Sequence, residues 1–557
     1  MYDYISDKLK SVLKPNYFSC ALATIIAMFL SSGYGLFNQI LNHDNAMGLL
    51  SEPFPIIRDI SFSTGRWMTA LIYGFGGDYS NPLIKGSIAI LSLAVFSILI
   101  VHIFDIEKRW ACILTGIAIG SFPAFSCLML FTHLTDVNFT FLCISVIPAL
   151  LCKKFRFGFL FGSVILFLCL AVNQALLCIT MGLCVAMLLL RLLKGEHIKT
   201  VILSGLTYLA MGVIAVTLYL LSIKISSSFV PLFTYRNFNN IGTFELRNLG
   251  NDLFQLCKGL IITFFLPREY PRFYHFLAPI LLFISVLLTA VIYFVVTAKN
   301  QVRKNGKKIG RISLILSLGF VFIFIVACGL VYFFGSGAQQ VHTLIGFVLL
   351  LVFSIAVFSN PGTLVCSEDS QKPSVKTALV HTLVTRHRKV YDLSVAVLVV
   401  SIVLYSFSMI IVSNNIILHN EIAYEKGSEF FAIIQRDIIN NPEYSPEKII
   451  IYAGNYSYSP LISGKNPVVL TPSTGIYGNR TMSGVYNPDN YLNIYGTLPN
   501  KIEIIQKIES KTVHEVAKQM PVYPSEGAIL GIDNFLIIKL SEMDKPISKD
   551  SDFYLLY

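Results

Sequence analysis

The sequence predicts a polytopic α-helical membrane protein with a small α/β domain at its C-terminal end. Of its 557 residues, 54% are hydrophobic and only 13% are charged, whereas a surface that faces water needs about a quarter of its residues charged. The apolar residues also gather into long runs over residues 1–413, and residues 414–557 break that pattern. This composition excludes a soluble multidomain enzyme, a disordered chain and a disulfide scaffold.

Eleven apolar runs predict about eleven transmembrane helices. A helix needs about 20 apolar residues to cross a bilayer, and the runs that approach this length are 17–37, 86–104, 111–131, 136–152, 156–172, 174–192, 201–223, 275–297, 312–334, 342–358 and 393–413. Only Asn173 and Gln174 separate the fifth run from the sixth, which predicts a tight hairpin. We therefore expect residues 1–413 to form the membrane domain.

The charge distribution predicts the orientation of these helices. Residues 1–413 carry a net charge of +15 and residues 414–557 a net charge of −4. Lys and Arg concentrate before the first run and in the even-numbered connections, above all in 299–311, and such connections are cytoplasmic in membrane proteins. We expect a bacterial inner-membrane protein with a cytoplasmic N-terminus and a periplasmic C-terminal domain. No basic cluster alternates with aromatic residues on a soluble module, so the expected partner is lipid and not nucleic acid.

Two of the predicted outer connections, 38–85 and 224–274, are long enough to fold. The first contains apolar residues at helical spacing over 56–73, and the second contains a short two-sided segment, 249–266, which predicts a helix lying in the membrane interface. Structured loops on one side only favour an enzyme that acts on a lipid at headgroup depth. In the tail, EKIIIYAG, AILGI and FLIIKL predict short strands, with 501–519 helical between them.

Polar residues in the outer connections are the candidate site, because ionisable groups are costly at membrane depth. A carboxylate there can accept a proton from a hydroxyl nucleophile, and arginines can hold a phosphate through paired hydrogen bonds. Each residue also has a structural alternative, since Asp136 can cap a helix, Arg66 can snorkel, Trp67 can anchor at the interface and Gln174 can satisfy a turn. The candidates are His43, Asp44, Arg66, Trp67, Asp136, Gln174, Tyr235 and Arg236.

The segment SSGYGLFNQILNHDNAMG and the later STGRW, with the eleven-span plan and the outer tail, resemble bacterial Gtr-type serotype-converting O-antigen glucosyltransferases of the GT-C superfamily. This resemblance implies an undecaprenyl-phosphate-linked sugar donor and a polysaccharide acceptor at the periplasmic face. It implies that Asp44 is the catalytic residue in the first outer loop and Asp136 a second acidic residue. We expect Arg66 or Arg236 to bind the phosphate of the lipid donor. His43-Asp44 stands where some GT-C members carry an acidic doublet, so a divalent metal is possible but not indicated, and no other cofactor is expected.

The function expected is an inverting GT-C glycosyltransferase that moves glucose from a polyprenyl-phosphate donor to O-antigen of lipopolysaccharide. His43, Trp67, Gln174, Tyr235 and the arginines are expected to contact its substrates. Two alternatives stay open. A lipid-linked oligosaccharide transporter or flippase would need charged residues along a path through the spans, and an O-antigen polymerase or ligase would act on a diphosphate-linked glycan.

Overall fold

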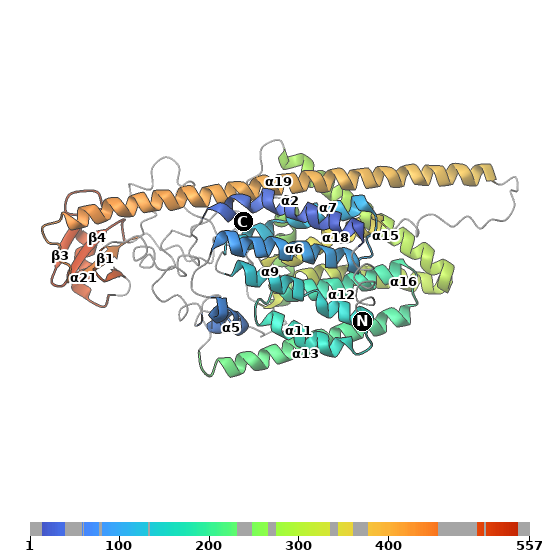
Figure 1. Cartoon of the computed structure of the whole chain (residues 1–557), viewed down its shortest axis with the longest axis horizontal. Coiled ribbons are helices and arrows are strands. Elements are labelled where there is room, and N and C mark those ends of the chain that lie inside the picture. The colour runs from blue at the N-terminus through green and yellow to red at the C-terminus, as the bar shows by residue number, and fades with distance from the viewer. Residues whose placement is uncertain are drawn as a thin grey trace.

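The protein is a bundle of apolar helices with a small sheet beyond one end (Figure 1). The structure is a computed structural model that describes residues 14–38, 58, 61–76, 81–131, 134–230, 248–265, 274–334, 343–359, 377–454, 498–505 and 508–543.

Within the described residues, eight helical segments are long and apolar enough to cross a membrane, or nine if one bent pair of helices counts as a single span. The bent pair is α7 (Arg109–Gly120) and α8 (Pro123–Met129), whose axes differ by 48°. Pro123 occupies the first turn of α8, where its missing N–H costs no hydrogen bond, so the chain restarts as a new helix. The eight are α2 (Pro15–Phe37), α6 (Pro82–Ile103), α9 with α10 (Thr135–Ile144 and Ile147–Lys154), α12 (Leu176–Leu193), α13 (Ile198–Ser226), α15 (Tyr274–Asn305), α16 (Lys307–Cys328) and α19 (Thr377–Ile439).

Every predicted apolar run coincides with helical structure, but two of these helices are short. The helix α11 (Gly158–Leu170) has 13 residues, which gives a length of about 20 Å against a hydrocarbon core of about 30 Å. The other is the 3₁₀ turn η4 (Ile345–Phe347) continued by α18 (Val348–Ser359). The predicted hairpin between the fifth and sixth runs is confirmed, because α11 ends at Leu170 and α12 begins at Leu176. The total of eleven spans stays a prediction.

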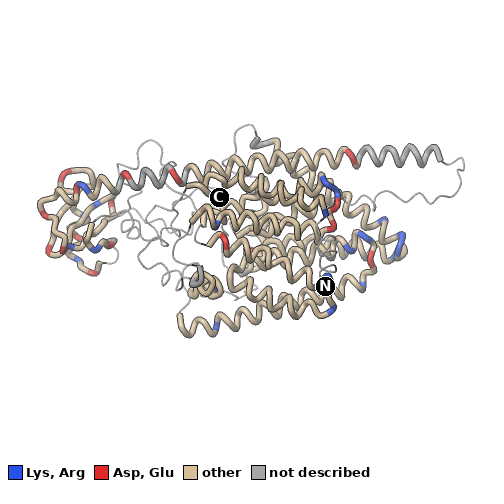
Figure 2. The backbone as a smooth tube through the Cα atoms, in the orientation of Figure 1, with Lys and Arg blue, Asp and Glu red and all other residues tan. Residues whose placement is uncertain are grey.

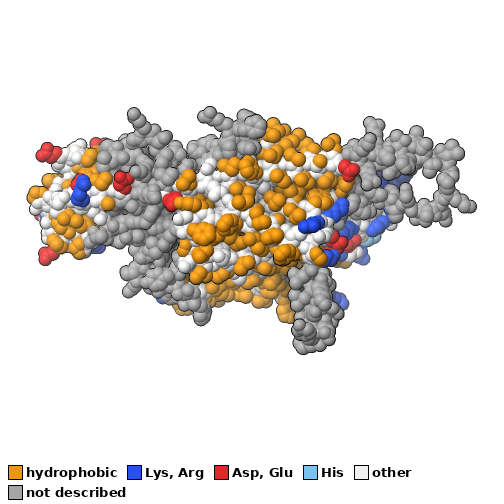
Figure 3. Space-filling view, turned by 45° about the horizontal axis from the view of Figure 1, so that its top comes forward, with side chains coloured by type: hydrophobic (Ala, Val, Ile, Leu, Met, Phe, Trp, Pro, Cys, Tyr) orange, Lys and Arg blue, Asp and Glu red, His pale blue; other side chains and the backbone are white. Residues whose placement is uncertain are grey.

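Helix α12 forms the centre of the bundle. Its membrane-length segment is 89% buried, compared with 28% for those of α13 and α16, and it contacts α13, α15, α16 and α18. A helix that is apolar on every side belongs in such a position. The outer helices instead expose large apolar side chains, and Figure 3 shows hydrophobic side chains covering much of the middle of the bundle on the face in view.

Helices α2 and α7 approach closely because α7 presents two glycines one turn apart. A Cβ atom on Gly116 would lie 2.3 Å from the carbonyl oxygen of Cys20, and one on Gly120 would lie 2.5 Å from that of Thr24. Small residues four apart let two membrane helices pack backbone against backbone. This contact fixes α2, whose C-terminal end leads into the first long connection.

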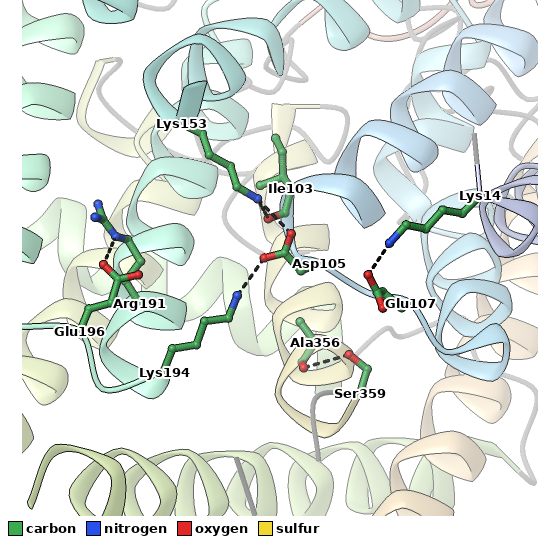
Figure 4. A network of polar contacts seen from close by, with 10 residues as sticks. All are labelled: Lys14, Ile103, Asp105, Glu107, Lys153, Arg191, Lys194, Glu196, Ala356 and Ser359. Carbon is green, nitrogen blue, oxygen red and sulfur yellow. Dashed lines mark hydrogen bonds and ion pairs between the residues drawn. The ribbon is translucent and has the colours of Figure 1, made fainter. Parts of the chain in front are cut away.

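Charged residues gather at one end of the bundle (Figure 2), which we call the basic end. It holds the turns around residues 104–108, 153–157, 194–197 and 306. The carboxylate of Asp105 lies 3.1 Å from Lys153 Nζ and 2.8 Å from Lys194 Nζ (Figure 4). Burial of this carboxyl opposes ionisation, but the hydrogen bond from Lys194 and the charge of Lys153 outweigh it, so the pKa of Asp105 lies below its usual value.

The side chains of α15 close the C-terminal end of α12 at this basic end. Asn300 Nδ2 donates to the carbonyl oxygen of Leu193 over 2.7 Å, and Gln301 Nε2 donates to that of Leu192 over 3.1 Å. The last carbonyls of a helix have no partner within the helix. The side-chain amides of α15 therefore donate hydrogen bonds to backbone carbonyls of α12, which lipid could not do.

Helix α19 joins the bundle to the tail. It has 63 residues, or about 95 Å at 1.5 Å per residue, and it continues without a break through residue 413. Asn414 Nδ2 donates to the carbonyl oxygen of Leu30 over 2.7 Å, and Tyr34 of α2 donates to Glu421. The far end of α19 contributes Ile434 and Ile438 to the core of the tail domain.

The described part of the tail forms a four-stranded sheet that is covered on both faces. Its strand order is β2-β1-β4-β3, with β1 parallel to β2 and β4 and with β3 antiparallel to β4. Alternate residues of β1 and β4 face α19 or the helix α21. The elements are β1 (Ile449–Ala453), β2 (Ile502–Ile504), α21 (Lys511–Gln519), β3 (Ile529–Ile532) and β4 (Phe535–Lys539).

Two local predictions need correction. The prediction of a helix over 501–519 is wrong in its first part, because Ile502 and Ile504 lie in strand β2, paired in register with β1. Pairing with a strand about 50 residues earlier overrides the local pattern. The apolar spacing over 56–73 also does not form one helix, since the backbone turns at Thr64 and Gly65 before α5 (Trp67–Gly76) begins.

We predict that Gly116→Ala destabilises the protein by about 1–3 kcal/mol, the usual cost of overpacking, because the new methyl group collides with the backbone of α2. The matched control is Gly319→Ala in α16, where a Cβ meets nothing within 4 Å and the helix gains propensity. Thermal unfolding in detergent measures both variants. Equal melting temperatures for the two would contradict the close approach of α2 and α7.

We predict that Asp105→Asn lowers stability by about 0.5–1 kcal/mol at pH 7, a modest value because the Asp105 side chain is 45% exposed. A carboxyl with a depressed folded-state pKa stabilises fully above its unfolded pKa, near 3.8. That stabilisation disappears as the pH falls through the folded pKa. The difference in melting temperature between wild type and variant should therefore disappear in melting curves recorded at progressively acidic pH. A double-mutant cycle with Lys194→Met isolates the pair, and a gap that persists at the lowest pH argues against the ion pair.

Candidate functional site

The end of the bundle opposite the basic end carries a second set of polar contacts, and we call it the site end. It holds α5 and the first turns of α6, α9 and α12. Gly65, with φ of +73°, terminates the short helical turn before α5, and the Arg66 N–H donates to Ser61 O over 2.7 Å while the Gly65 N–H donates to Phe62 O over 3.0 Å. These two bonds form a Schellman motif, which fixes the backbone on which Arg66 stands.

Gln174 is the centre of this set. Its Oε1 accepts a hydrogen bond from Arg66 Nε over 3.3 Å, and its Nε2 donates to Thr64 O over 3.1 Å and to the Tyr219 hydroxyl over 2.7 Å. The Tyr219 hydroxyl in turn donates to Gly65 O over 3.2 Å. A Cβ on Gly65 would lie 2.8 Å from this hydroxyl, so glycine is required for space as well as for φ.

Helix α5 is fastened to the bundle through its first turn. The Met68 N–H and the Thr69 hydroxyl donate to Ala171 O and Val172 O, over 3.2 and 3.1 Å. Both carbonyls follow the end of α11, where a helix leaves such groups without partners. The Trp67 indole N–H donates to Ser222 Oγ over 3.0 Å, and its ring lies 5.9 Å from that of Phe167. These contacts anchor Trp67 between α11 and α13.

A second charged contact lies where α5, α6 and α9 meet. Lys85 Nζ is 3.6 Å from Asp136 Oδ1 and 5.6 Å from the centre of the Tyr73 ring. Both side chains of the ion pair are largely buried, with 13% of Lys85 and 27% of Asp136 exposed. Among the described residues, no group hydrogen-bonds to Asp136 Oδ1. Asp136 lies in the first turn of α9, where the helix dipole favours a negative charge.

The Arg66 and Lys85 clusters are linked through neighbouring residues. Asn138 follows Asp136 by two positions, and its Oδ1 accepts a hydrogen bond of 3.3 Å from Asn173 Nδ2. Asn173 directly precedes Gln174. A belt of polar side chains from α5, α6, α9 and the hairpin before α12 therefore crosses the site end.

The structure places four of the eight predicted site residues, and it joins two of them directly. Arg66 bonds to Gln174, Trp67 bonds to Ser222 of α13, and Asp136 pairs with Lys85, which is not among the predicted site residues. The other four, His43, Asp44, Tyr235 and Arg236, lie outside the described residues. Sequence reasoning missed Lys85, Tyr219 and Ser222, although Tyr219, Ser222 and Ser226 recur on one side of α13 in an otherwise apolar run.

The described part of the chain contains no group of three His, Cys, Asp or Glu side chains placed to hold a metal ion. A guanidinium held at Nε presents its Nη pair to a phosphate, and the Lys85–Asp136 pair offers both a donor and an acceptor.

Comparison with known families identifies one match. A family model described as "Glucosyl transferase GtrII" matches residues 33–355, more than half of the chain. The matched segment contains the whole polar belt and ends before α19. No curated protein and no solved structure matches the chain significantly.

We predict that Gln174→Met loosens the segment 61–70, because the substitution removes the two hydrogen bonds that join Gln174 to Arg66 and to Thr64 O. It also removes the bond from Gln174 to Tyr219, whose hydroxyl donates to Gly65 O. At about 0.5–1.5 kcal/mol for each of the two bonds to the segment, amide hydrogen exchange there should accelerate about fivefold or more. Gln301→Met is the matched control, since Gln301 donates to Leu192 O and Glu196 O at the basic end. It should accelerate exchange around residues 192–196 only. Unchanged exchange in 61–70 for Gln174→Met would show that the segment is held by other contacts.

Proposed function

Since the chain belongs to the GtrII glucosyl transferase family, we propose that it transfers glucose from a polyprenyl-phosphate-linked donor to a cell-surface glycan such as O-antigen. The observation that carries this proposal is the polar belt at one end of a lipid-facing bundle. A donor with a long hydrocarbon tail can lie along the apolar flank of such a bundle while its headgroup reaches the belt. The acceptor, a hydrophilic polymer, approaches from the aqueous side.

The proposed reaction is a single inverting displacement. Asp44 takes the proton of an acceptor hydroxyl, the hydroxyl oxygen attacks the anomeric carbon, and the bond from that carbon to the phosphate oxygen breaks with its electron pair. The polyprenyl phosphate that leaves carries the negative charge, and Arg66 or Arg236 stabilises it by paired hydrogen bonds. Asp136 orients donor or acceptor. The bonds that Gln174 and Tyr219 make around Arg66 support this role, because a clamp works best when its geometry is fixed before the substrate arrives.

The proposed location is the bacterial inner membrane. Basic turns favour the cytoplasm, so the basic end is assigned to that side and the site end, with the tail domain beyond it, to the periplasm. In this arrangement residues 1–413 form the GT-C catalytic domain. Residues 414–557 lie on the acceptor side, where they support or dock the glycan.

We predict that Asp44→Asn abolishes glucosyl transfer, with a loss of 100-fold or more from removal of the general base. Arg66→Lys should reduce transfer about tenfold or more, because lysine cannot form the bidentate contact with phosphate. The assay combines purified protein, polyprenyl-phosphate glucose and the acceptor glycan, and it measures glucose incorporated. The control is Asp392→Asn, which should retain full activity, because Asp392 is an exposed residue of α19 near the basic end of the bundle.

Full activity in Asp44→Asn would remove the proposed base. The assay also separates the alternative functions. A flippase would move the lipid-linked sugar between leaflets without a transferred product, and a polymerase or ligase would require a diphosphate-linked glycan.

A further inference from the structure

A small pocket opens beside the Lys85–Asp136 pair. It lies between the end of α2, the start of α6, the end of α8, the start of α9 and the middle of α19. Its polar lining includes Ser32 and Lys85, and Leu36, Met129 and Ile417 are among the residues of its apolar walls. Asp136 follows the lining residue Thr135 and holds the Lys85 ammonium at 3.6 Å.

Ser32 is the feature that points to a ligand. Its side chain is 1% exposed, and among the described residues its hydroxyl has no hydrogen-bond partner. A serine in a membrane helix usually bonds back to a carbonyl of the preceding turn, as the neighbouring Ser31 does to Ala27 O over 2.8 Å. A buried hydroxyl without a hydrogen-bond partner destabilises the folded protein. Ser32 carries such a hydroxyl and lines the pocket, where a ligand can supply the missing partner.

The charges around the pocket favour a neutral, hydroxylated ligand over an anion. Lys85 attracts a phosphate, but the Asp136 carboxylate beside it repels one, and the pair is nearly neutral as a unit. A sugar hydroxyl is both a donor and an acceptor, so it can accept from the ammonium or from Ser32 and donate to the carboxylate.

We propose that this pocket receives the hydroxyl edge of the hexose that the enzyme transfers, with Ser32 and Lys85 as binding residues. This inference rests on the proposed function and adds the element that selects the sugar. Because the pocket is narrow, it takes one edge of the ring and not an oligosaccharide. Hydrogen bonds to buried polar groups discriminate strongly against a ligand that lacks the matching hydroxyl, since the protein group is then left without a partner.

The test measures ligand binding by the full chain in phosphatidylcholine nanodiscs. The probes are decyl β-D-glucopyranoside, its monodeoxy derivatives and decyl phosphate, which share one tail and differ in the headgroup. Ser32→Ala should weaken binding of the glucoside about 3- to 10-fold, the equivalent of one neutral hydrogen bond, and should leave decyl phosphate unchanged. One monodeoxy glucoside should bind wild type more weakly by a similar factor and show no further loss in Ser32→Ala.

Ser31→Ala is the matched control, since it removes a hydroxyl that is already satisfied within α2, and it should change nothing. Gly86→Ala supplies a steric variant that leaves every polar group in place. Its Cβ would lie 2.1 Å from the Leu36 Cδ2 atom, so a wall of the pocket must shift and glucoside affinity should fall.

Three outcomes decide the proposal. Loss of decyl phosphate binding in Ser32→Ala, with the glucoside unaffected, would overturn it in favour of an anion pocket. Equal affinities of wild type and Ser32→Ala for every probe would also overturn it and leave water as the partner of Ser32. The predicted glucoside pattern in a protein that transfers no glucose would support the subsite and reject the proposed function, so the two failures are distinguishable.

Discussion

Lipid excludes charge from the middle of the bundle, and this constraint decides where the polar contacts of the protein form. Backbone groups in hydrocarbon must be satisfied within helices, and ionisable side chains are expensive there. The described ion pairs of the bundle accordingly lie near the ends of its helices, as Asp105 with two lysines and Lys85 with Asp136 illustrate. Between the ends the helices are held by packing, with close approach where Gly116 and Gly120 meet α2, and by uncharged hydrogen bonds such as that of Tyr293 to Leu189 O.

The two ends use their polar groups differently. At the basic end the ion-paired side chains are 29–66% exposed, so each ion pair contributes little individually. At the site end the Lys85–Asp136 pair is more deeply buried, and hydrogen bonds fasten a segment of the first long connection onto the bundle. The single side chain of Gln174 hydrogen-bonds to Arg66, Thr64 and Tyr219. That end therefore holds a preformed arrangement of donors and acceptors, as binding and catalysis require.

Helix α19 makes the tail domain continuous with this arrangement. Ile417 lines the pocket beside Lys85, Asn414 and Glu421 bond to α2, and Ile434 and Ile438 enter the core of the tail sheet. One helix without a break thus carries both a wall of the pocket and a face of the tail domain. The tail therefore follows directly from the end of the bundle where the proposed reaction takes place.

The sequence by itself determined the class of protein, the positions of the apolar helices, the hairpin at Asn173 and Gln174, and the strands of β1, β3 and β4, because these follow from composition and local periodicity. It also singled out Arg66 and Gln174, though separately. Tertiary structure alone decided that these two residues, 108 positions apart, bond to each other, that Lys85 pairs with Asp136, that Ser32 lines a pocket, and that residues 502–504 form a strand. Such contacts depend on which helices and strands pack together, and local sequence patterns do not predict which elements pack together.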